Sequence, residues 1–437
     1  MFQGFQNVPR IPELRRRVGF TLLMLAVYRI GVHVPTPGVD GKALADFFAQ
    51  HSNSMVGMVN MLSGGALERF SIFALGVMPY ISASIILQLL TVVVPHLERL
   101  SKEGEIGRRK ITQYTRYATV FLSLIQGIFI SVGLEQLTSP GGSPVVYNPG
   151  WSFRTMTVLT LTTGTVFLMW VGEQISERGI GNGISLIIFT GIVAGLPSAA
   201  ATVIEFVREG EMGVLVVVAL LAFMVAVVAF IIFMERAQRR IPVHYAKRVV
   251  GRRVYGGQSS HLPLKLNTAG VIPPIFASSL LGFPGTIAGF VDRPWARAVQ
   301  NWLVPGAAVY EVCYVALIIF FCYFYTAVTF RTDDVADNMK KFGGYIPGIR
   351  PGARTAEYID RILARITLVG ALYVSAVCVL PTILIQRFNV PFYFGGTALL
   401  IVIGVALDTV AQIETHMLTR SYQGFMRRGR IKGRREL

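Results

Sequence analysis

Ten long apolar runs constrain this sequence more than any other feature. Each run has about twenty residues, the length that an α-helix needs to cross the roughly 30 Å hydrocarbon core of a bilayer. Of the 437 residues, 53% are hydrophobic and only 15% are charged, which is too few charges for a soluble protein of this size. The sequence therefore predicts an all-α polytopic membrane protein with ten transmembrane helices. The runs occupy residues 18–34, 71–94, 117–134, 155–172, 180–204, 212–234, 268–290, 305–330, 366–386 and 392–413.

Lysine and arginine gather on one side of these predicted spans. Ten spans place both termini on the same side, and that side holds 33 of the 41 lysines and arginines, whereas the opposite loops hold 7. The remaining one, Arg29, lies inside the first span. Because positive loops stay in the cytoplasm, we predict that both termini are cytoplasmic. No cleavage pattern of small residues follows the N-terminal arginines and the first run, so we expect an uncleaved span.

Two loops on the predicted cytoplasmic side are longer than a helix connection requires. Segment 235–267 carries a net charge of +7, and its basic residues alternate with apolar and aromatic ones, which predicts a projecting hairpin. Segment 331–365 contains the turn sequence GGYIPGIRPG, with Arg350 at its centre. Charges that only set topology are one interpretation. The length of the loops favours docking surfaces for a large polyanionic or acidic partner, such as ribosomal RNA or a cytosolic motor.

Catalytic motifs are missing from the sequence. It contains no HExxH, Walker-type or GxSxG pattern, and GIGNG at 179–183 lies between two spans, where it predicts a turn. The six histidines lie near span ends or in loops, and the three cysteines have no metal-ligand spacing. We therefore expect no enzyme activity, no cofactor and no metal.

A secondary transporter of a small solute is the main alternative, because ten spans can form a five-plus-five repeat. Transporters of polar solutes usually carry ionisable residues near the middle of the membrane, and these span centres nearly lack them. Isoleucine pairs recur instead, with Ile81 and Ile85 in one span and Ile184 and Ile188 in another. Each pair is spaced i, i+4 and shares a helix face. The pattern by itself favours packing or lipid contact for these residues.

Residues 55–94 pose a problem of length. As one helix these residues would extend about 60 Å, twice the thickness of the hydrocarbon core. Only Ser63-Gly64-Gly65 and the charged pair Glu68-Arg69 interrupt the apolar sequence. An amphipathic loop would explain the charges, but it would not explain an apolar stretch that leads directly into a span.

Several long stretches resemble the SecY family, which forms the central channel of the bacterial Sec protein translocase. They are MLSGGALERFSIFALGVMPYISASIILQLL, GRRKITQYTRY, FLMWVGEQISERGIGNGISLIIF, AGVIPPIFASS, GGYIPGIRPG and PFYFGGTALLI, and their order matches as well. The resemblance implies two pseudo-symmetric five-helix halves, residues 1–204 and 205–413, around an hourglass pore, followed by the basic tail 414–437. It also implies a seam between spans 2–3 and 7–8 that opens into lipid, through which hydrophobic segments of unfolded preproteins leave the channel.

The same resemblance implies a re-entrant half-helix that plugs the pore before the second span. Glycines allow such a chain to turn, and a fold-back at membrane depth requires surrounding protein or a water-filled cavity. The resemblance assigns this role to Asn60, Met61, Leu62, Ser63, Gly64, Gly65, Ala66, Leu67, Glu68, Arg69 and Phe70.

A second site implied by the resemblance is a ring of β-branched residues at the pore constriction. Such side chains are stiff and apolar, so a ring of them can exclude ions without binding a passing peptide. The ring positions are Ile81, Ile85, Ile184, Ile188, Ile275 and Ile401.

The resemblance also implies partners. These are the small membrane subunits SecE and SecG, the motor SecA, the ribosome, signal peptides and nascent chains, and the lipid of the bacterial inner membrane. The residues expected to bind the motor or the ribosome are Arg239, Arg240, Arg252, Arg253, Arg350 and Tyr422.

Overall fold

The computed structural model describes residues 11–50, 63–137, 144–210, 213–245, 248–250, 253–255, 259–289, 302, 307–388 and 396–428. The chain divides into two compact units. The first unit comprises Met1–Tyr80, Arg116–Leu196 and Ile401–Leu437, and the second comprises Ile81–Thr115 and Pro197–Leu400.

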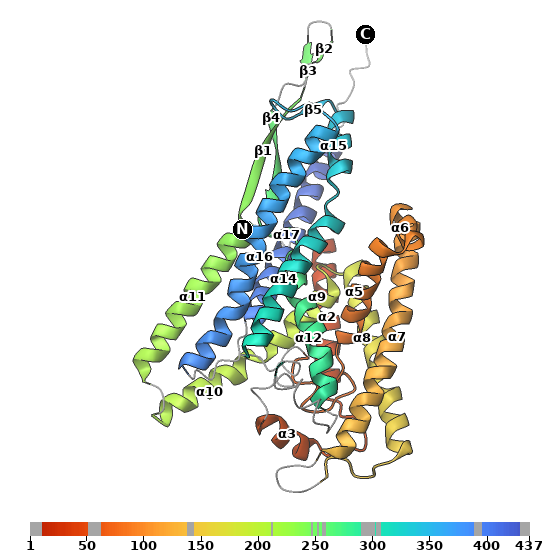
Figure 1. Cartoon of the computed structure of the whole chain (residues 1–437), viewed down its shortest axis with the longest axis vertical. Coiled ribbons are helices and arrows are strands. Elements are labelled where there is room, and N and C mark those ends of the chain that lie inside the picture. Colours follow the sequence, from red (N-terminus) through yellow and green to blue (C-terminus); the bar gives the residue numbers. More distant parts are fainter. Residues whose placement is uncertain are drawn as a thin grey trace. The chain divides into compact units, whose positions relative to one another are not determined.

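Helices build most of the first unit (Figure 1). They are α2 (Pro12–Val32), α3 (Gly41–Gln50), most of α7 (Glu105–Gln136), α8 (Trp151–Arg178), α9 (Gly183–Ala194) and most of α17 (Gly396–Arg428). The turn between α8 and α9 packs tightly, because Asn182 caps α9 and the backbone N–H of Gly181 donates to Gln412 of α17 at 2.9 Å. This cap satisfies helix N–H groups that lipid could not.

The second unit combines helices with two small sheets. Its helices are α5 (Met78–Val93), α6 (Pro95–Lys102), α10 (Leu196–Arg208), α11 (Val214–Arg236), α12 (Ile272–Gly289), α14 (Ala308–Thr329), α15 (Thr332–Lys341) and α16 (Ala353–Phe388). Its strands are β1 (Gln238–Tyr245), β2 (Arg248–Val250), β3 (Arg253–Tyr255), β4 (Ser259–Lys265) and β5 (Gly344–Tyr345).

Helices overlap all ten of the predicted spans. Among the described residues, seven helices are long and apolar enough to cross a membrane, and the bent pair of α5 and α6 makes eight. The bend between α5 and α6 is 99°, at Val94. Its cause is local: Pro95 at the start of α6 lacks a backbone donor and holds Val94 extended. The run 180–204 is also divided, into α9 and α10.

The hairpin predicted in segment 235–267 is confirmed. Strands β1 and β4 pair antiparallel, with Ile241 opposite Leu262, and β2 pairs with β3 beyond them (Figure 1). Alternate side chains of β1 are buried at Ile241 and Val243, which is the period expected of a strand with one covered face. These strands therefore belong to a folded projection with an apolar face.

Candidate functional site

The segment before α5 does not form a helix in its described part. Asn60, Met61 and Leu62 lie outside the described residues, and positions 63–77 form successive turns until α5 begins at Met78. The backbone φ angle is positive at Gly64 (69°), Gly65 (80°) and Phe70 (42°), and such angles interrupt a right-handed helix. In its described part, residues 63–70, the predicted plug therefore consists of turns.

Backbone hydrogen bonds hold this turn segment in the first unit. The N–H of Thr36 donates to the carbonyl of Phe70 at 2.8 Å, and the N–H of Ile72 donates to the carbonyl of Val34 at 3.0 Å. Phe70 itself is only 1% exposed. Burial and hydrogen bonds on both sides offset the cost of a left-handed conformation at a bulky residue.

The six predicted ring isoleucines lie on four helices. Their i, i+4 pairs occur as expected: Ile81 and Ile85 share a face of α5, and Ile184 and Ile188 share a face of α9. Three of the six belong to each unit. All are buried except Ile184, which is half-buried and packs over Gly172 of α8. The ring itself stays a prediction. The first unit holds Ile184, Ile188 and Ile401, and the second holds Ile81, Ile85 and Ile275.

The predicted basic docking residues divide by location. Arg239 and Arg240 are exposed on β1, and Arg350 is exposed in the turn after β5. Arg252 lies outside the described residues. The side chains of Arg253, on β3, and Tyr422, on α17, also lie outside them.

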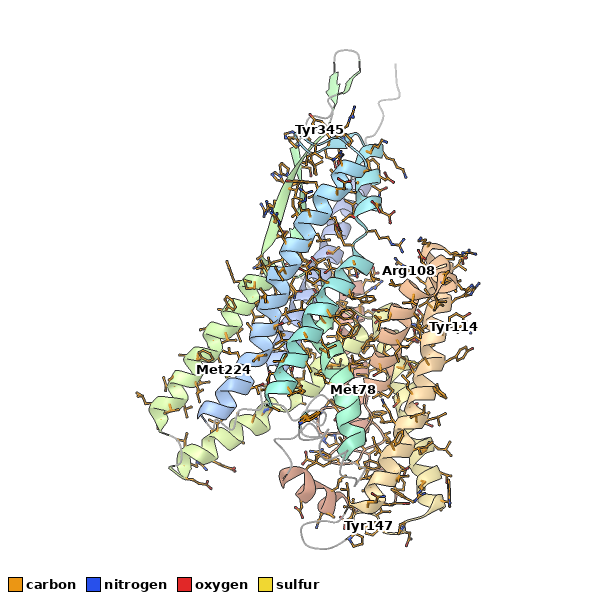
Figure 2. All side chains as sticks on the ribbon, in the orientation of Figure 1. Met78, Arg108, Tyr114, Tyr147, Met224 and Tyr345 are labelled. Carbon is orange, nitrogen blue, oxygen red and sulfur yellow. The ribbon has the colours of Figure 1, made fainter. Side chains whose placement is uncertain are left out.

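The two basic loops join in one sheet, which the sequence does not reveal. Strand β5 of the second loop pairs antiparallel with β1 of the first, with His244 opposite Tyr345 and Tyr245 opposite Gly344. The rings of His244 and Tyr345 lie 6.1 Å apart between centroids, and Tyr345 stands at the end of the sheet in Figure 2. We call the three-stranded sheet β4-β1-β5, together with the turn 343–352, the platform. A two-residue strand leaves no periodic signal that could predict this pairing.

The platform has its own small apolar core. Side chains of β1, β4 and the turn after β5 pack against one face of α16, and partly buried residues of α15 cover them. At the base, Asn267 donates to Glu235 at 2.7 Å and accepts a hydrogen bond from the N–H of Gly270 at 3.0 Å. This contact fixes the exit from the sheet into α12. The core comprises Ile241, Leu264, Ile346, Ile359, Ile362 and Ile366.

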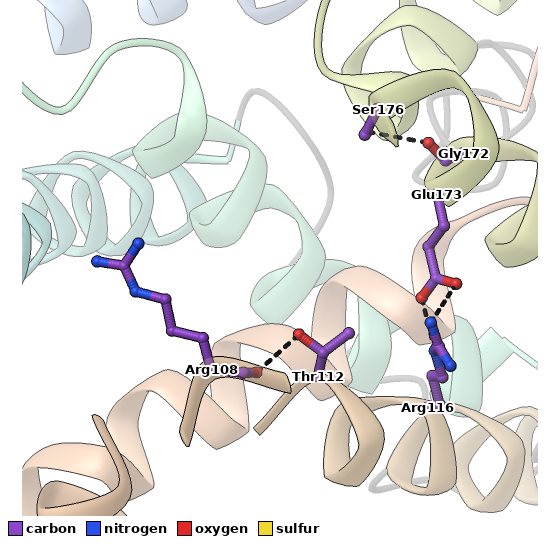
Figure 3. Close-up of polar contacts among 6 residues, drawn as sticks. All are labelled: Arg108, Thr112, Arg116, Gly172, Glu173 and Ser176. Carbon is purple, nitrogen blue, oxygen red and sulfur yellow. Dashed lines mark hydrogen bonds and ion pairs between the residues drawn. The ribbon is translucent and has the colours of Figure 1, made fainter. Parts of the chain in front are cut away.

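Two ion pairs join α7 to α8 in the first unit. Arg116 forms a bidentate pair with Glu173, with both N–O distances at 2.8 Å (Figure 3). At the other ends of the helices, Nε of Arg154 donates to Glu135 at 2.9 Å. Nineteen residues separate the two pairs along each helix, a distance of about 28 Å. The pairs therefore bracket an apolar length close to one bilayer core.

Among the described residues, no group of three or more His, Cys, Asp or Glu side chains lies close enough to hold a metal ion. Cys313, Cys322 and Cys378 are free thiols, and the last two are buried.

Tyr28 and Arg29 of α2 donate hydrogen bonds to the turn segment, and the sequence alone assigns neither of them a role. An arginine inside a span was the one available signal.

Comparisons with known proteins agree with these features. The sequence model of the SecY family matches residues 71–410. "Protein translocase subunit SecY" of Escherichia coli strain K12 is 53% identical over 425 residues and covers 96% of each chain. The subunit of the same name from Pseudomonas aeruginosa is 50% identical and covers 97% of this chain and 95% of its own.

Solved structures show the same fold. "The structure of a protein conducting channel" superposes with a TM-score of 0.65 at 14% identity and covers 93% of both chains. A Sec61 chain in "the Canine ribosome-channel complex from the endoplasmic reticulum" has a TM-score of 0.61, also at 14% identity, and again 93% of both chains is covered. The resemblance found in the sequence motifs is thereby confirmed, and so is the multi-pass, mainly helical fold.

Proposed function

Because this chain belongs to the SecY family, we propose that it is the protein-conducting subunit of a bacterial translocase. It is a channel subunit and not an enzyme. It moves unfolded preproteins across the cytoplasmic membrane and releases hydrophobic segments sideways into lipid. The observation that carries this proposal is the 53% identity over nearly the full length to a protein translocase subunit. The fold alone would not support this proposal, because one fold can serve unrelated functions.

We propose three working parts within the chain. Residues 60–70, whose described part (63–70) forms turns, are the plug, the six isoleucines form the constriction, and the platform is the docking surface. The plug proposal rests on the hydrogen bonds that hold Phe70 and Ile72 to Thr36 and Val34 in the loop after α2. The ring proposal rests on apolar, β-branched side chains that offer a peptide neither charge nor hydrogen bond. Two five-helix halves, joined at residue 204, surround this pore.

The platform suits a large anionic partner. Its exposed arginines project from a folded sheet that rests on α16, so a partner bound there acts directly on a membrane helix. The first candidates are the ribosome and the motor SecA, and SecE and SecG are the expected small membrane subunits. Signal peptides and nascent chains are the transported partners.

We also propose that both termini and the platform face the cytoplasm of a bacterial cell. The bias of lysine and arginine toward this side supports the orientation. The two ion pairs between α7 and α8 support the depth of insertion, because they flank an apolar length close to one bilayer core.

Reconstitution tests the proposal against a small-solute transporter. Vesicles that contain this chain with its small subunits receive SecA, ATP and an unfolded preprotein, and protease protection measures entry. We expect preprotein entry that depends on ATP, without uptake of radiolabelled sugars or amino acids. Solute uptake without preprotein entry would overturn the proposal. The lack of ionisable residues at the span centres disfavours that outcome.

A further inference from the structure

We propose that Tyr28 and Arg29 form a latch on α2 that holds the plug in the closed channel. This inference rests on the proposed function and assigns positioning residues to it. The hydroxyl of Tyr28 donates to the carbonyl of Ser63 at 3.1 Å, and Nη1 of Arg29 donates to the carbonyl of Gly64 at 3.1 Å. Two consecutive donors on a helix thus bind two consecutive carbonyls at the start of the turn segment.

The conformation of the segment explains why these carbonyls are available to α2. Gly64 and Gly65 have positive φ angles, so the chain leaves the helical path at this point and its carbonyls turn outward. Gly64 also approaches Gly191 of α9 closely, since a Cβ on Gly64 would lie 2.7 Å from the Cα of Gly191. The close approach positions the Gly64 carbonyl beside Arg29. A larger side chain at Gly64 would therefore hold the segment away from α9.

The latch also explains an arginine within a span. Charged side chains inside membrane helices pair with one another or with backbone carbonyls, because hydrocarbon solvates them poorly. Arg29 meets this requirement through the plug itself. Release of the plug therefore deprives Arg29 of its carbonyl partner, so the closed state is favoured until a signal peptide or a motor supplies the opening free energy.

Tyr28 permits a substitution that removes only one hydrogen bond. Its side chain is buried, and its ring stacks on Phe73 with centroids 6.1 Å apart. Phe73 in turn stacks on Phe167 of α8 at 5.9 Å. In Tyr28→Phe this aromatic stack is retained and the donor to Ser63 is lost. The variant consequently tests the latch without a cavity in the core.

The first experiment measures ion conductance of resting channels, reconstituted with their small subunits in planar bilayers. Loss of one neutral hydrogen bond predicts a roughly fivefold rise in open events for Tyr28→Phe. Arg29→Met loses a charge-assisted bond, so we expect a rise of roughly tenfold or more. Arg29→Lys retains a cationic donor and should fall between wild type and Arg29→Met. Tyr147→Phe, at an exposed tyrosine of the same unit, is the matched control and should conduct like wild type.

The second experiment reports the position of the plug directly. A single cysteine replaces Ala66, which is 0% exposed while the segment is held, in a background without the three native cysteines, and a membrane-impermeant maleimide is added from the extracytoplasmic side. We expect Tyr28→Phe to raise the labelling rate by roughly the same fivefold factor. Wild-type conductance together with a wild-type labelling rate in Tyr28→Phe would overturn the latch, even if Arg29→Met fails to fold.

The same vesicles separate failure of the latch from failure of the proposed function. Each preparation is also assayed for SecA-driven preprotein entry. Entry in wild type with unchanged leak and labelling in Tyr28→Phe rejects the latch and leaves the channel function in place. No entry in wild type, under conditions in which a related translocase is active, rejects the channel function itself.

Discussion

At the scale of single residues, backbone geometry determines how firmly an exposed charge is positioned for a binding partner. Arg350 lies between Gly348 and Gly352, whose φ angles are +79° and +107°. Its carbonyl accepts a hydrogen bond from the hydroxyl of Thr355 at 3.0 Å. The two glycines and this hydrogen bond fix the backbone on either side of Arg350. The loop therefore loses less conformational entropy when a partner binds the arginine.

Reversal of this charge should impair translocation without unfolding the protein. We expect Arg350→Glu to reduce SecA- or ribosome-driven preprotein entry by roughly tenfold, because attraction at a fixed position becomes repulsion. Circular dichroism and resting conductance should match wild type. Arg354→Glu is the control, since Arg354 is exposed on the first turn of α16 and forms a surface ion pair with Glu357 at 3.8 Å. Equal entry in both variants would mean that Arg350 only sets topology.

The isoleucine ring leads to a second prediction at this scale. Replacement of Ile81 and Ile188 together with serine should raise ion conductance, because a hydroxyl gives water a partner at an apolar constriction. Single-channel recordings measure the change. Serine at Ile86 and Ile204, which are 44% and 54% exposed, is the matched control because these side chains face outward. Leak from the outward-facing pair alone would show that other residues line the constriction.

At the scale of secondary-structure elements, α7 and α8 behave as a paired unit. One ion pair joins Arg116 of α7 to Glu173 of α8, and a second, nineteen residues along each helix, joins Glu135 to Arg154. Bidentate geometry and a Glu173 side chain that is 15% exposed favour the Arg116–Glu173 pair over a monodentate, fully exposed pair. The pair of helices can therefore resist separation during channel opening.

A charge swap tests this pairing. Arg116→Glu should lower the midpoint of thermal unfolding in detergent by a few degrees, roughly 2–5 °C, because two carboxylates then face each other. Adding Glu173→Arg should recover at least half of the loss, since opposite charges again meet. The exposed pair Lys102–Glu98 is the control, and its swap should leave the midpoint nearly unchanged. No recovery in the double variant would contradict the pairing.

At the scale of the whole molecule, topology makes a prediction that does not depend on any one site. A single cysteine at exposed Ser260 on β4, in a background without native cysteines, should react with an impermeant maleimide in inverted membrane vesicles only. A cysteine at Tyr147, which is 64% exposed, should react in spheroplasts only. Both expectations follow from the positive-inside rule. The reverse labelling pattern would show that the chain has the opposite orientation in the membrane, with the platform outside the cytoplasm.

Sequence predicted the spans well because lipid allows few alternatives to a helix of about twenty apolar residues. It predicted a hairpin in segment 235–267 from the alternation of basic with apolar and aromatic side chains at its centre, and the strands there do pair antiparallel. It could not predict the contacts of Tyr28 and Arg29, because their acceptors are backbone carbonyls, which leave no trace in residue identity. It also placed the start of this span at residue 71, whereas α5 begins at Met78, because positive φ angles at Phe70 and Gly76 interrupt a helix before that point.

The pairing of β1 with β5 has a consequence for synthesis. The β1–β4 hairpin can form once Lys265 leaves the ribosome, but β5 must wait until Tyr345 has emerged, about a hundred residues after its partner His244. At about 5–20 residues per second, this delay is roughly 5–20 s. The membrane helices α12 and α14 are made within that interval. The complete sheet is thus available only on a chain whose helices through α14 have been made, so under the proposed function a half-made copy would lack the full docking surface.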